Sequence, residues 1–260
     1  MHETELWTVT NGEGPIVAMA IHAGHALRPE IAERMRLSDA ERLREEDPYT
    51  DVWTEIAATR VVAHRSRFEV DLNRPRKSAV YVSADQSWGL DVWTAPLPGA
   101  VIKRSLEIRE RFYAMLEGLL EEKRRRYGRF VVYDIHSYNH RRAGPDGAVA
   151  DAAGNPEVNV GTGSLDRARW SSLVDGFMAD LRAFGSSGPG LDVRENVRFK
   201  GGYLAQFVHE RFRESGCTLA IEFKKTFMDE WTGEPDDARI AWLGSVLAWT
   251  VPGVVRELAR

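Results

Sequence analysis

PIVAMAIHAG, residues 15–24, is the stretch of sequence that best indicates the fold class of this chain. It starts directly after Gly14, stays apolar as far as Ile21 and turns polar at His22. An uninterrupted apolar run of this length is typical of a strand that other elements cover on both faces. Strands of this kind occur in parallel sheets, so the stretch predicts a layered α/β protein.

Further strands and helices alternate along the chain. Strands are predicted over 59–72, 130–135 and 217–223. The first of these includes FEVDL at 68–72, in which apolar and acidic residues alternate at the two-residue period of a strand. Helices are predicted over 103–127, where apolar residues recur at three- to four-residue spacing, and over 169–184 and 236–249. This alternation indicates an α/β fold with a largely parallel sheet. No shift in composition marks a boundary, so residues 1–260 are predicted to form one domain.

Composition excludes several classes of protein. The chain has 35 Lys+Arg against 39 Asp+Glu, a formal charge of -4, which argues against a nucleic-acid partner. The basic run at 123–126 is interpreted as a helix end, where cations are favoured. The single cysteine, Cys217, excludes a disulfide scaffold and a multi-thiolate zinc site, so a metal would need His and carboxylate ligands. There is no signal-peptide pattern at the N-terminus and no apolar run of about 20 residues, so we expect a cytoplasmic protein without a membrane partner.

Polar residues of chemical interest follow each predicted strand. They are His22 after the first strand, Asn73 and Arg74 after the second, His136 after the third and Glu222 near the end of the fourth. In open α/β sheets, ligands bind beyond the carboxyl ends of the strands. We therefore expect these five side chains to meet in one site.

This set of side chains suits metal-assisted hydrolysis of an amide. A catalytic zinc ion typically has three protein ligands, such as two imidazoles and a carboxylate, and lowers the pKa of a bound water to about 7. Glu222 would then accept the proton of that water and deliver it to the leaving nitrogen. Arg74 would bind a carboxylate of the substrate through its planar guanidinium.

Several segments resemble, in the same order, those of N-formylglutamate amidohydrolases, over about residues 15–230. The segments DLNR at 71–74 and DIHS at 134–137 are the specific ones. The first is also similar to the aspartoacylase branch of the zinc carboxypeptidase-like superfamily. The other matching segments are IHAG at 21–24, NVGT at 159–162, FKGGY at 199–203 and AIE at 220–222.

The resemblance implies a three-layer α/β sandwich of the carboxypeptidase type, with a central mixed, largely parallel sheet and one zinc ion per chain. The implied reaction is hydrolysis of the formamide of an N-formyl amino acid, such as N-formylglutamate, to formate and a free amine. The implied roles are His22 and His136 as zinc ligands, Glu222 as general base, Asn73 with Arg74 as the clamp on the substrate carboxylate, and Arg198 with Lys200 as a second substrate-contacting segment.

One metal ligand departs from the pattern of the carboxypeptidases. Where their motif has His-x-x-Glu, this chain has His25 three positions after His22. We predict Asp47 as the third ligand, from the acidic segment EDPYTD at 46–51. Asp51, Glu46 and His25 stay open as alternatives.

The substrate and its access are also open. Arg141, Arg142 and Lys224 add positive charge beside the predicted metal, which would suit a dicarboxylate substrate. Residues 143–164, rich in Gly, Ala, Asn and Pro, form a candidate lid. Two other functions compete with the amidohydrolase: a carboxypeptidase-like zinc peptidase that acts on small peptides, and a metal-free anion-binding relative. The sequence indicates no oligomeric state.

Overall fold

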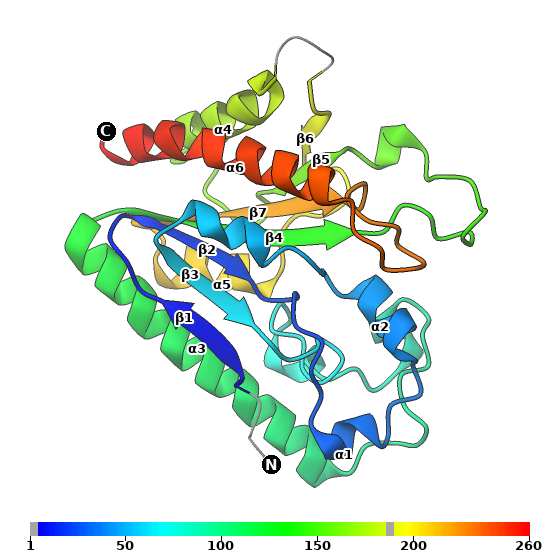
Figure 1. Ribbon diagram of the computed structural model, residues 1–260. Coiled ribbons are helices and arrows are strands. Elements are labelled where there is room, and N and C mark those ends of the chain that lie inside the picture. The colour runs from blue at the N-terminus through cyan, green and yellow to red at the C-terminus, as the bar shows by residue number, and fades with distance from the viewer. Residues whose placement is uncertain (1–4, 186–189) are drawn as a thin grey trace.

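A seven-stranded sheet forms the centre of the computed structural model, which describes residues 5–185 and 190–260 (Figure 1). The strands are β1 (Trp7–Thr10), β2 (Ile16–Ala20), β3 (Thr59–Ala63), β4 (Phe130–Tyr138), β5 (Val158–Gly161), β6 (Val193–Glu195) and β7 (Gly216–Lys224). Their order in the sheet is β1-β3-β2-β4-β7-β5-β6. The central strands β3, β2, β4 and β7 are parallel, whereas β1 is antiparallel to β3 and β5 is antiparallel to β7. The predicted α/β class with a mixed, largely parallel sheet is confirmed.

Helices cover both faces of this sheet, which gives three layers (Figure 1). The helices α3 (Gly99–Tyr127) and α5 (Tyr203–Arg211) pack on one face, and α4 (Ser171–Ala183) and α6 (Asp237–Leu258) pack on the other. Two short helices, α1 (Pro29–Ala32) and α2 (Asp39–Glu45), follow β2. The polar segment after α2 returns to the carboxyl end of β2, where the Asp47 backbone N–H donates to the His22 carbonyl oxygen at 3.0 Å.

The central strand β4 serves both layers and also supplies polar groups, and all of its residues are buried. Tyr133 and Ile135 belong to the apolar cluster beneath α4 and α6, whereas Val132 belongs to the cluster beneath α3 and α5. Because side chains alternate along a strand, Asp134 and His136 share the face of Val132. The apolar residues of β4 thereby hold two polar side chains at a fixed position at the end of the sheet.

The strand predicted over 59–72 is half wrong, because β3 ends at Ala63 and 66–72 forms turns. The acidic residues in FEVDL are buried rather than solvent-facing. Glu69 accepts a hydrogen bond from Arg28 Nε at 2.8 Å, and Asp71 lies against His22. The alternation of apolar and acidic residues therefore reflects internal ion pairs rather than one buried and one solvated strand face.

Other element boundaries also differ from the prediction. β4 and β7 continue to Tyr138 and Lys224, so His136 lies within its strand rather than after it. The strands β1, β5 and β6 and the helix α5 were not predicted, and β5 lies inside the irregular stretch 143–164. These are short elements of three to nine residues, which give little periodic signal.

The last helix, α6, is longer than the predicted 236–249 and continues through Pro252. Pro252 has no backbone N–H to donate to the carbonyl of Ala248, which is an exposed residue. By length and composition alone α6 could cross a membrane. In the structure its residues Leu243, Leu247 and Val254 are buried in the core beside α4.

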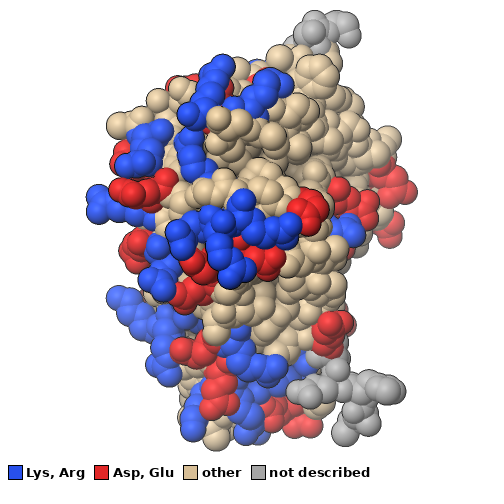
Figure 2. All heavy atoms as spheres, turned by 90° about the vertical axis from the view of Figure 1, so that its left-hand side faces the viewer, with Lys and Arg blue, Asp and Glu red and all other residues tan. Residues whose placement is uncertain are grey.

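The basic run at the end of α3 lies on a face where charges of both signs are mixed. Figure 2 shows Lys and Arg side chains gathered on this side of the molecule, with acidic side chains between them. Arg124 pairs with Glu121 and Arg126 pairs with Glu13, each at 2.5 Å. Much of the positive charge of the run is therefore balanced within the protein.

Candidate active site

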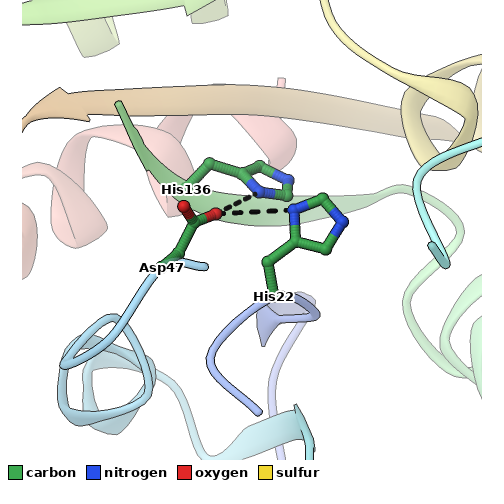
Figure 3. Close-up of side chains that lie close together, drawn as sticks. All are labelled: His22, Asp47 and His136. Carbon is green, nitrogen blue, oxygen red and sulfur yellow. Dashed lines mark hydrogen bonds and ion pairs between the residues drawn. The ribbon is translucent and has the colours of Figure 1, made fainter. Parts of the chain in front are cut away.

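Three buried side chains from separate segments converge at the carboxyl end of the sheet. His22 follows β2, Asp47 follows α2 and His136 lies near the end of β4, and their ligand-capable atoms lie within 4.8 Å of one another (Figure 3). The Nδ1 atoms of His22 and His136 lie 3.4 Å and 3.1 Å from the same oxygen, Asp47 Oδ2. The other oxygen, Asp47 Oδ1, accepts a hydrogen bond from Ser137 Oγ at 3.1 Å. One carboxylate oxygen and two imidazole nitrogens therefore face a common point.

The far side of each imidazole is held by a second carboxylate. His22 Nε2 lies 2.8 Å from Asp71 Oδ1, and His136 Nε2 lies 2.9 Å from Asp134 Oδ1. In the neutral tautomer that donates Nε2–H to these carboxylates, each Nδ1 keeps its lone pair. Those lone pairs then face the Asp47 oxygen, and His22 Nδ1 has no hydrogen-bond partner among the described residues. A cation at this point would satisfy all three groups, so the residues fit a divalent metal ion.

Charge interactions within the cluster are strong. Burial raises the pKa of Asp47, but the neighbouring imidazoles of His136 and His22 outweigh it and hold this pKa well below its usual value. Burial also disfavours a charged His136, yet Asp134 and Asp47 more than offset it and raise the pKa of His136 well above 6.5. The two carboxylates beside it therefore favour the protonated form of His136.

The carboxylate of Asp71 is itself fixed by three donors. Arg67 donates from a guanidinium nitrogen to Asp71 Oδ2 at 2.8 Å, the Tyr81 hydroxyl donates to the same oxygen, and the Asn73 backbone N–H donates to Oδ1 at 2.8 Å. Burial raises the pKa of Asp71, but Arg67 and His22 lower it well below its usual value. His22 is therefore oriented by a permanently ionised group.

Glu222 lies beside the cluster on the same face of the sheet. It pairs in register with His136 on the neighbouring parallel strand, and it lines the same cavity. Its carboxyl group makes no hydrogen bond or ion pair within residues 5–185 and 190–260. Burial, reinforced by Asp47 and Asp134, raises its pKa to about 8, although His136 acts in the opposite direction. A free carboxyl with such a pKa can exchange a proton near neutral pH, as a general acid or base must.

A cavity of about 280 Å³ opens over these groups. Its wall includes the predicted residues Arg74 and Lys200, together with Trp88 and Phe199. Trp88 has a left-handed backbone with a φ of 56°, and its exposed ring lies 4.7 Å from the Arg67 guanidinium. Strained non-glycine residues of this kind are frequent where a protein contacts a ligand.

The residues predicted to bind substrate divide into two groups. Arg74 lies over the Tyr81 ring at 4.8 Å and has one long contact to Asp71, so its guanidinium faces the cavity with few partners. Lys200 lines the cavity, whereas Arg198 is absent from the described lining residues and lies over the ring of Phe199 at 5.8 Å.

Asn73, which was predicted to bind the substrate carboxylate, has its side-chain amide engaged within the protein. Its Oδ1 accepts from the Leu204 backbone N–H at 3.0 Å, and its Nδ2 lies 3.2 Å from His136 Nε2. Gly202 is needed beside it, because a Cβ there would lie 2.3 Å from Asn73 Oδ1. Asn73 therefore connects the start of α5 to a candidate metal ligand.

The alternatives to Asp47 point elsewhere. Glu46 Oε2 accepts from His25 Nδ1 at 2.6 Å, and its other oxygen accepts from Ser66. Asp51 is exposed. Of the four acidic or imidazole candidates for the third ligand, the structure brings Asp47 to the two histidines.

The structure also shows where the other predicted basic residues and the candidate lid lie. Arg142 lines the cavity but forms two hydrogen bonds with Glu45, at 3.2 Å and 3.0 Å, while Arg141 faces Asp229. Lys224 is not among the described lining residues. The stretch 143–164 contains the buried strand β5 at 158–161, and most of its residues before Asn155 are exposed or half-buried.

Sequence reasoning missed several site residues, namely Asp71, Asp134, Glu45, Lys225 and Trp88. Asp134 precedes His136 by two residues, which is the strand period that puts both on one face, so this residue had a usable signal. Of the others, Glu45 ends the short helix α2, Asp71 lies between two turns, Trp88 lies in a turn, and Lys225 directly follows β7.

A polar cluster of this composition, at the carboxyl end of a mostly parallel sheet in a three-layer α/β domain, is typical of metal-dependent hydrolases. Residues 14–228 match the N-formylglutamate amidohydrolase family, and the chain belongs to this family. The resemblance found in the sequence motifs is thus confirmed.

Individual relatives agree with this assignment. The chain is 26% identical to the N-formylglutamate deformylase of Pseudomonas aeruginosa over 270 aligned residues, which cover 98% of this chain and 94% of the relative. Its fold is similar to that of the N-formylglutamate amidohydrolase from Ralstonia eutropha, with a TM-score of 0.75, 19% identity and 98% coverage of both chains. A gene product from Agrobacterium tumefaciens is similar at a TM-score of 0.65, 19% identity and 96% coverage of both chains.

Proposed function

We propose that this chain is a metal-dependent amidohydrolase that removes the formyl group from an N-formyl amino acid, with N-formylglutamate as the leading substrate and zinc as the leading metal. The observation that carries the proposal is the convergence of His22, Asp47 and His136 beside the free carboxyl of Glu222. Membership of the family and the name of the Pseudomonas aeruginosa relative support the choice of substrate.

The chemistry follows from the positions of the side chains. A divalent ion held by His22, Asp47 and His136 would supply Lewis acidity, which lowers the pKa of a water molecule and polarises a carbonyl. Glu222 would take one proton from the attacking water and pass it to the amide nitrogen as the C–N bond breaks, which leaves formate and a free amino group. Arg74 and Lys200 would bind carboxylate groups of the substrate, and the burial of the cluster would keep bulk water from competing with these contacts.

The first experiment measures metal content by elemental analysis and formate release from N-formylglutamate for the wild-type protein, His22→Ala and His136→Ala. We expect about one metal ion per wild-type chain and loss of both metal and activity in the two variants. A wild-type protein that binds no divalent metal would contradict the proposal. A protein that binds metal and releases an amino acid from a dipeptide, but no formate, would instead be a peptidase.

Glu222→Gln tests the proton-transfer role separately. The amide keeps the shape of the side chain but cannot take a proton, so we expect kcat to fall by about 10²- to 10⁴-fold. Because Glu222 is not part of the three-residue cluster, the metal content should stay at the wild-type level. Unchanged turnover in a metal-loaded Glu222→Gln protein would remove Glu222 from the mechanism.

A further inference from the structure

Lys225 is a fully buried lysine at the edge of the candidate active site. It directly follows β7, its backbone N–H donates to the Tyr138 carbonyl oxygen at 3.0 Å, and 1% of its surface is exposed. Its side chain contributes to the wall of the cavity. Lys225 has no part in the sequence motifs that indicate the site or in the proposed proton transfer.

The ammonium group of Lys225 binds the backbone of the segment that carries Asp47. Nζ donates to the carbonyl oxygen of Arg44 at 2.5 Å and to that of Glu46 at 2.7 Å. The Glu46 carbonyl belongs to the peptide group that joins Glu46 to Asp47. The N–H of the same peptide group donates to the His22 carbonyl oxygen at 3.0 Å. Both polar atoms of this peptide group are therefore fixed, one by the end of β7 and the other by the end of β2.

A cation at this position is costly unless its charge is used. Burying an ammonium group is unfavourable because it removes the charge from water, and buried charges are normally paired with an opposite charge. Lys225 forms no ion pair within the described residues; its hydrogen-bond acceptors are two neutral carbonyls. The carboxylates of Asp47, Glu45 and Glu230 interact with its charge from a longer range. A neutral side chain of similar volume would fill the space without this cost, but it would not hold the two carbonyls.

We propose that Lys225 is a positioning residue for the metal centre: by fixing the Glu46–Asp47 peptide group, it holds the Asp47 carboxylate where His22 and His136 can share a cation with it. The proposal rests on the metal site of the proposed function. Lys225 acts through Asp47, because its Nζ bonds the backbone carbonyls of Arg44 and Glu46 rather than a side chain of the three-residue cluster.

The test is a double-substitution cycle read out as metal affinity. Zn²⁺ affinity is measured by competition with a chelator for the wild-type protein, Lys225→Met, Asp47→Asn and the double variant. Loss of an outer contact that orients a ligand typically weakens metal binding by roughly 10- to 100-fold, and we expect Lys225→Met to show a loss of this size. The effect of Lys225→Met is then measured again in the Asp47→Asn protein. There the change in the logarithm of the Zn²⁺ affinity should be less than about a third of the change in the wild-type background, because substitutions of residues that act as a unit are not additive.

Lys123→Met is the matched control. Lys123 is also fully buried and donates from Nζ to a backbone carbonyl, that of Gly12 at 2.6 Å, but it lies on α3 away from the cavity. This variant should lose thermal stability and keep the wild-type Zn²⁺ affinity. Lys225→Gln, which keeps a shorter donor, replaces Lys225→Met if the latter does not yield folded protein.

The outcomes separate the two proposals. A wild-type protein without affinity for Zn²⁺ would overturn the proposed function, and the inference with it. A wild-type protein that binds Zn²⁺, with unchanged affinity in folded Lys225→Met or with additive effects in the cycle, would overturn the role of Lys225 alone. Weakened and non-additive binding, with the Lys123→Met control unchanged, would support it.

Discussion

Arg74 presents its guanidinium to the cavity with a single long ion-pair contact, 3.6 Å from Nε to Asp71 Oδ2. The neighbouring Arg67 is different, because its guanidinium is committed to Asp71 and to the Tyr81 hydroxyl. Of these two arginines, Arg74 is the one with free donors for a substrate carboxylate. A planar pair of donors matches a carboxylate in a way that a lysine ammonium does not.

Arg74→Lys is therefore expected to reduce kcat/KM for N-formylglutamate by about tenfold or more, although the charge is kept. Steady-state kinetics of formate release measures this effect. Lys77→Arg is a suitable control, since Lys77 is an exposed residue of the same segment outside the described cavity lining. An unaltered kcat/KM in Arg74→Lys would exclude Arg74 from carboxylate binding.

His209 is a buried histidine outside the cavity. Its Nε2 accepts from the Thr218 backbone N–H at 2.9 Å, so the ring is neutral and Nδ1–H faces Ser164 Oγ at 2.8 Å. Burial disfavours the charged form and lowers the pKa of His209 to about 4. Between pH 6.5 and 4 the unfolded chain binds a proton that the folded chain does not.

The stability due to His209 is therefore complete above about pH 6.5 and decreases as pH falls towards about 4, by ~1.4 kcal/mol per pH unit and about 3 kcal/mol in all. Denaturant unfolding at a series of pH values should show this slope in the wild-type protein. His209→Gln, which does not titrate, should have a shallower slope over the same range. Parallel curves for the two proteins would contradict this assignment.

Candidate site residues were easier to find in the sequence than the side chains that orient them. His22 follows β2, and His136 and Glu222 lie near the ends of β4 and β7, three apolar strands whose ends can be recognised from composition. Asp71 and Lys225 could not be assigned in this way. What places them is a set of long-range contacts, such as that of Lys225 with the segment after α2, which leave no periodic pattern in the sequence.

At the scale of elements, helices and strands were predicted correctly where a long apolar run or a clear periodicity of apolar residues marked them. The strands β2, β4 and β7 and the helices α3, α4 and α6 were all found, with errors confined to their ends. The failure at 68–72 has the opposite cause, because its two-residue period is produced by buried ion pairs within turns. The pattern of apolar and polar residues does not distinguish an acidic side chain in solvent from one in a buried ion pair.

The start of α5 offers a test at this scale. Gly202→Ala would put a Cβ 2.3 Å from Asn73 Oδ1, and Asn73 is held between Leu204 and His136. We expect a loss of about 1–3 kcal/mol in the free energy of unfolding, together with a lower kcat/KM, because the clash displaces a neighbour of the candidate metal centre. Denaturant unfolding and formate-release kinetics measure the two effects.

Gly176→Ala is the matched control for this prediction. Gly176 lies within α4, and a Cβ there would have no atom within 4 Å. Alanine in a helix interior is favoured over glycine by about 0.5–1 kcal/mol, so this variant should gain stability and keep its activity. A Gly202→Ala protein as stable and active as the Gly176→Ala protein would show that α5 can shift without consequence.

For the whole molecule, the candidate metal centre joins parts of the chain that are far apart in sequence. His22 follows β2, Asp47 lies in the segment after α2, and His136 lies in β4 (Figure 3). An ion bound only by the folded state stabilises it by about 2.7 kcal/mol at a free concentration 100 times its Kd. Removal of an ion held by these three residues would therefore destabilise the whole fold.

Treatment with a chelator should lower Tm by roughly 5 to 10 °C in the wild-type protein, as expected for a domain of this size. Differential scanning calorimetry with and without chelator measures the shift. His136→Ala should unfold at a temperature that the chelator does not change. An equal shift in both proteins would place the relevant ion outside this cluster.

The order of strands in the sheet also has a consequence for synthesis of the chain. β4 lies between β2 and β7, yet β7 is made only after β5, α4, β6 and α5. Until β7 is made, β4 is an edge strand with no neighbour on that side. Its run FVVY has a high β propensity and carries no charge. The nascent protein thus carries a self-association hazard that disappears only when its last strand emerges from the ribosome, which makes chains truncated before Gly216 prone to aggregate rather than merely inactive.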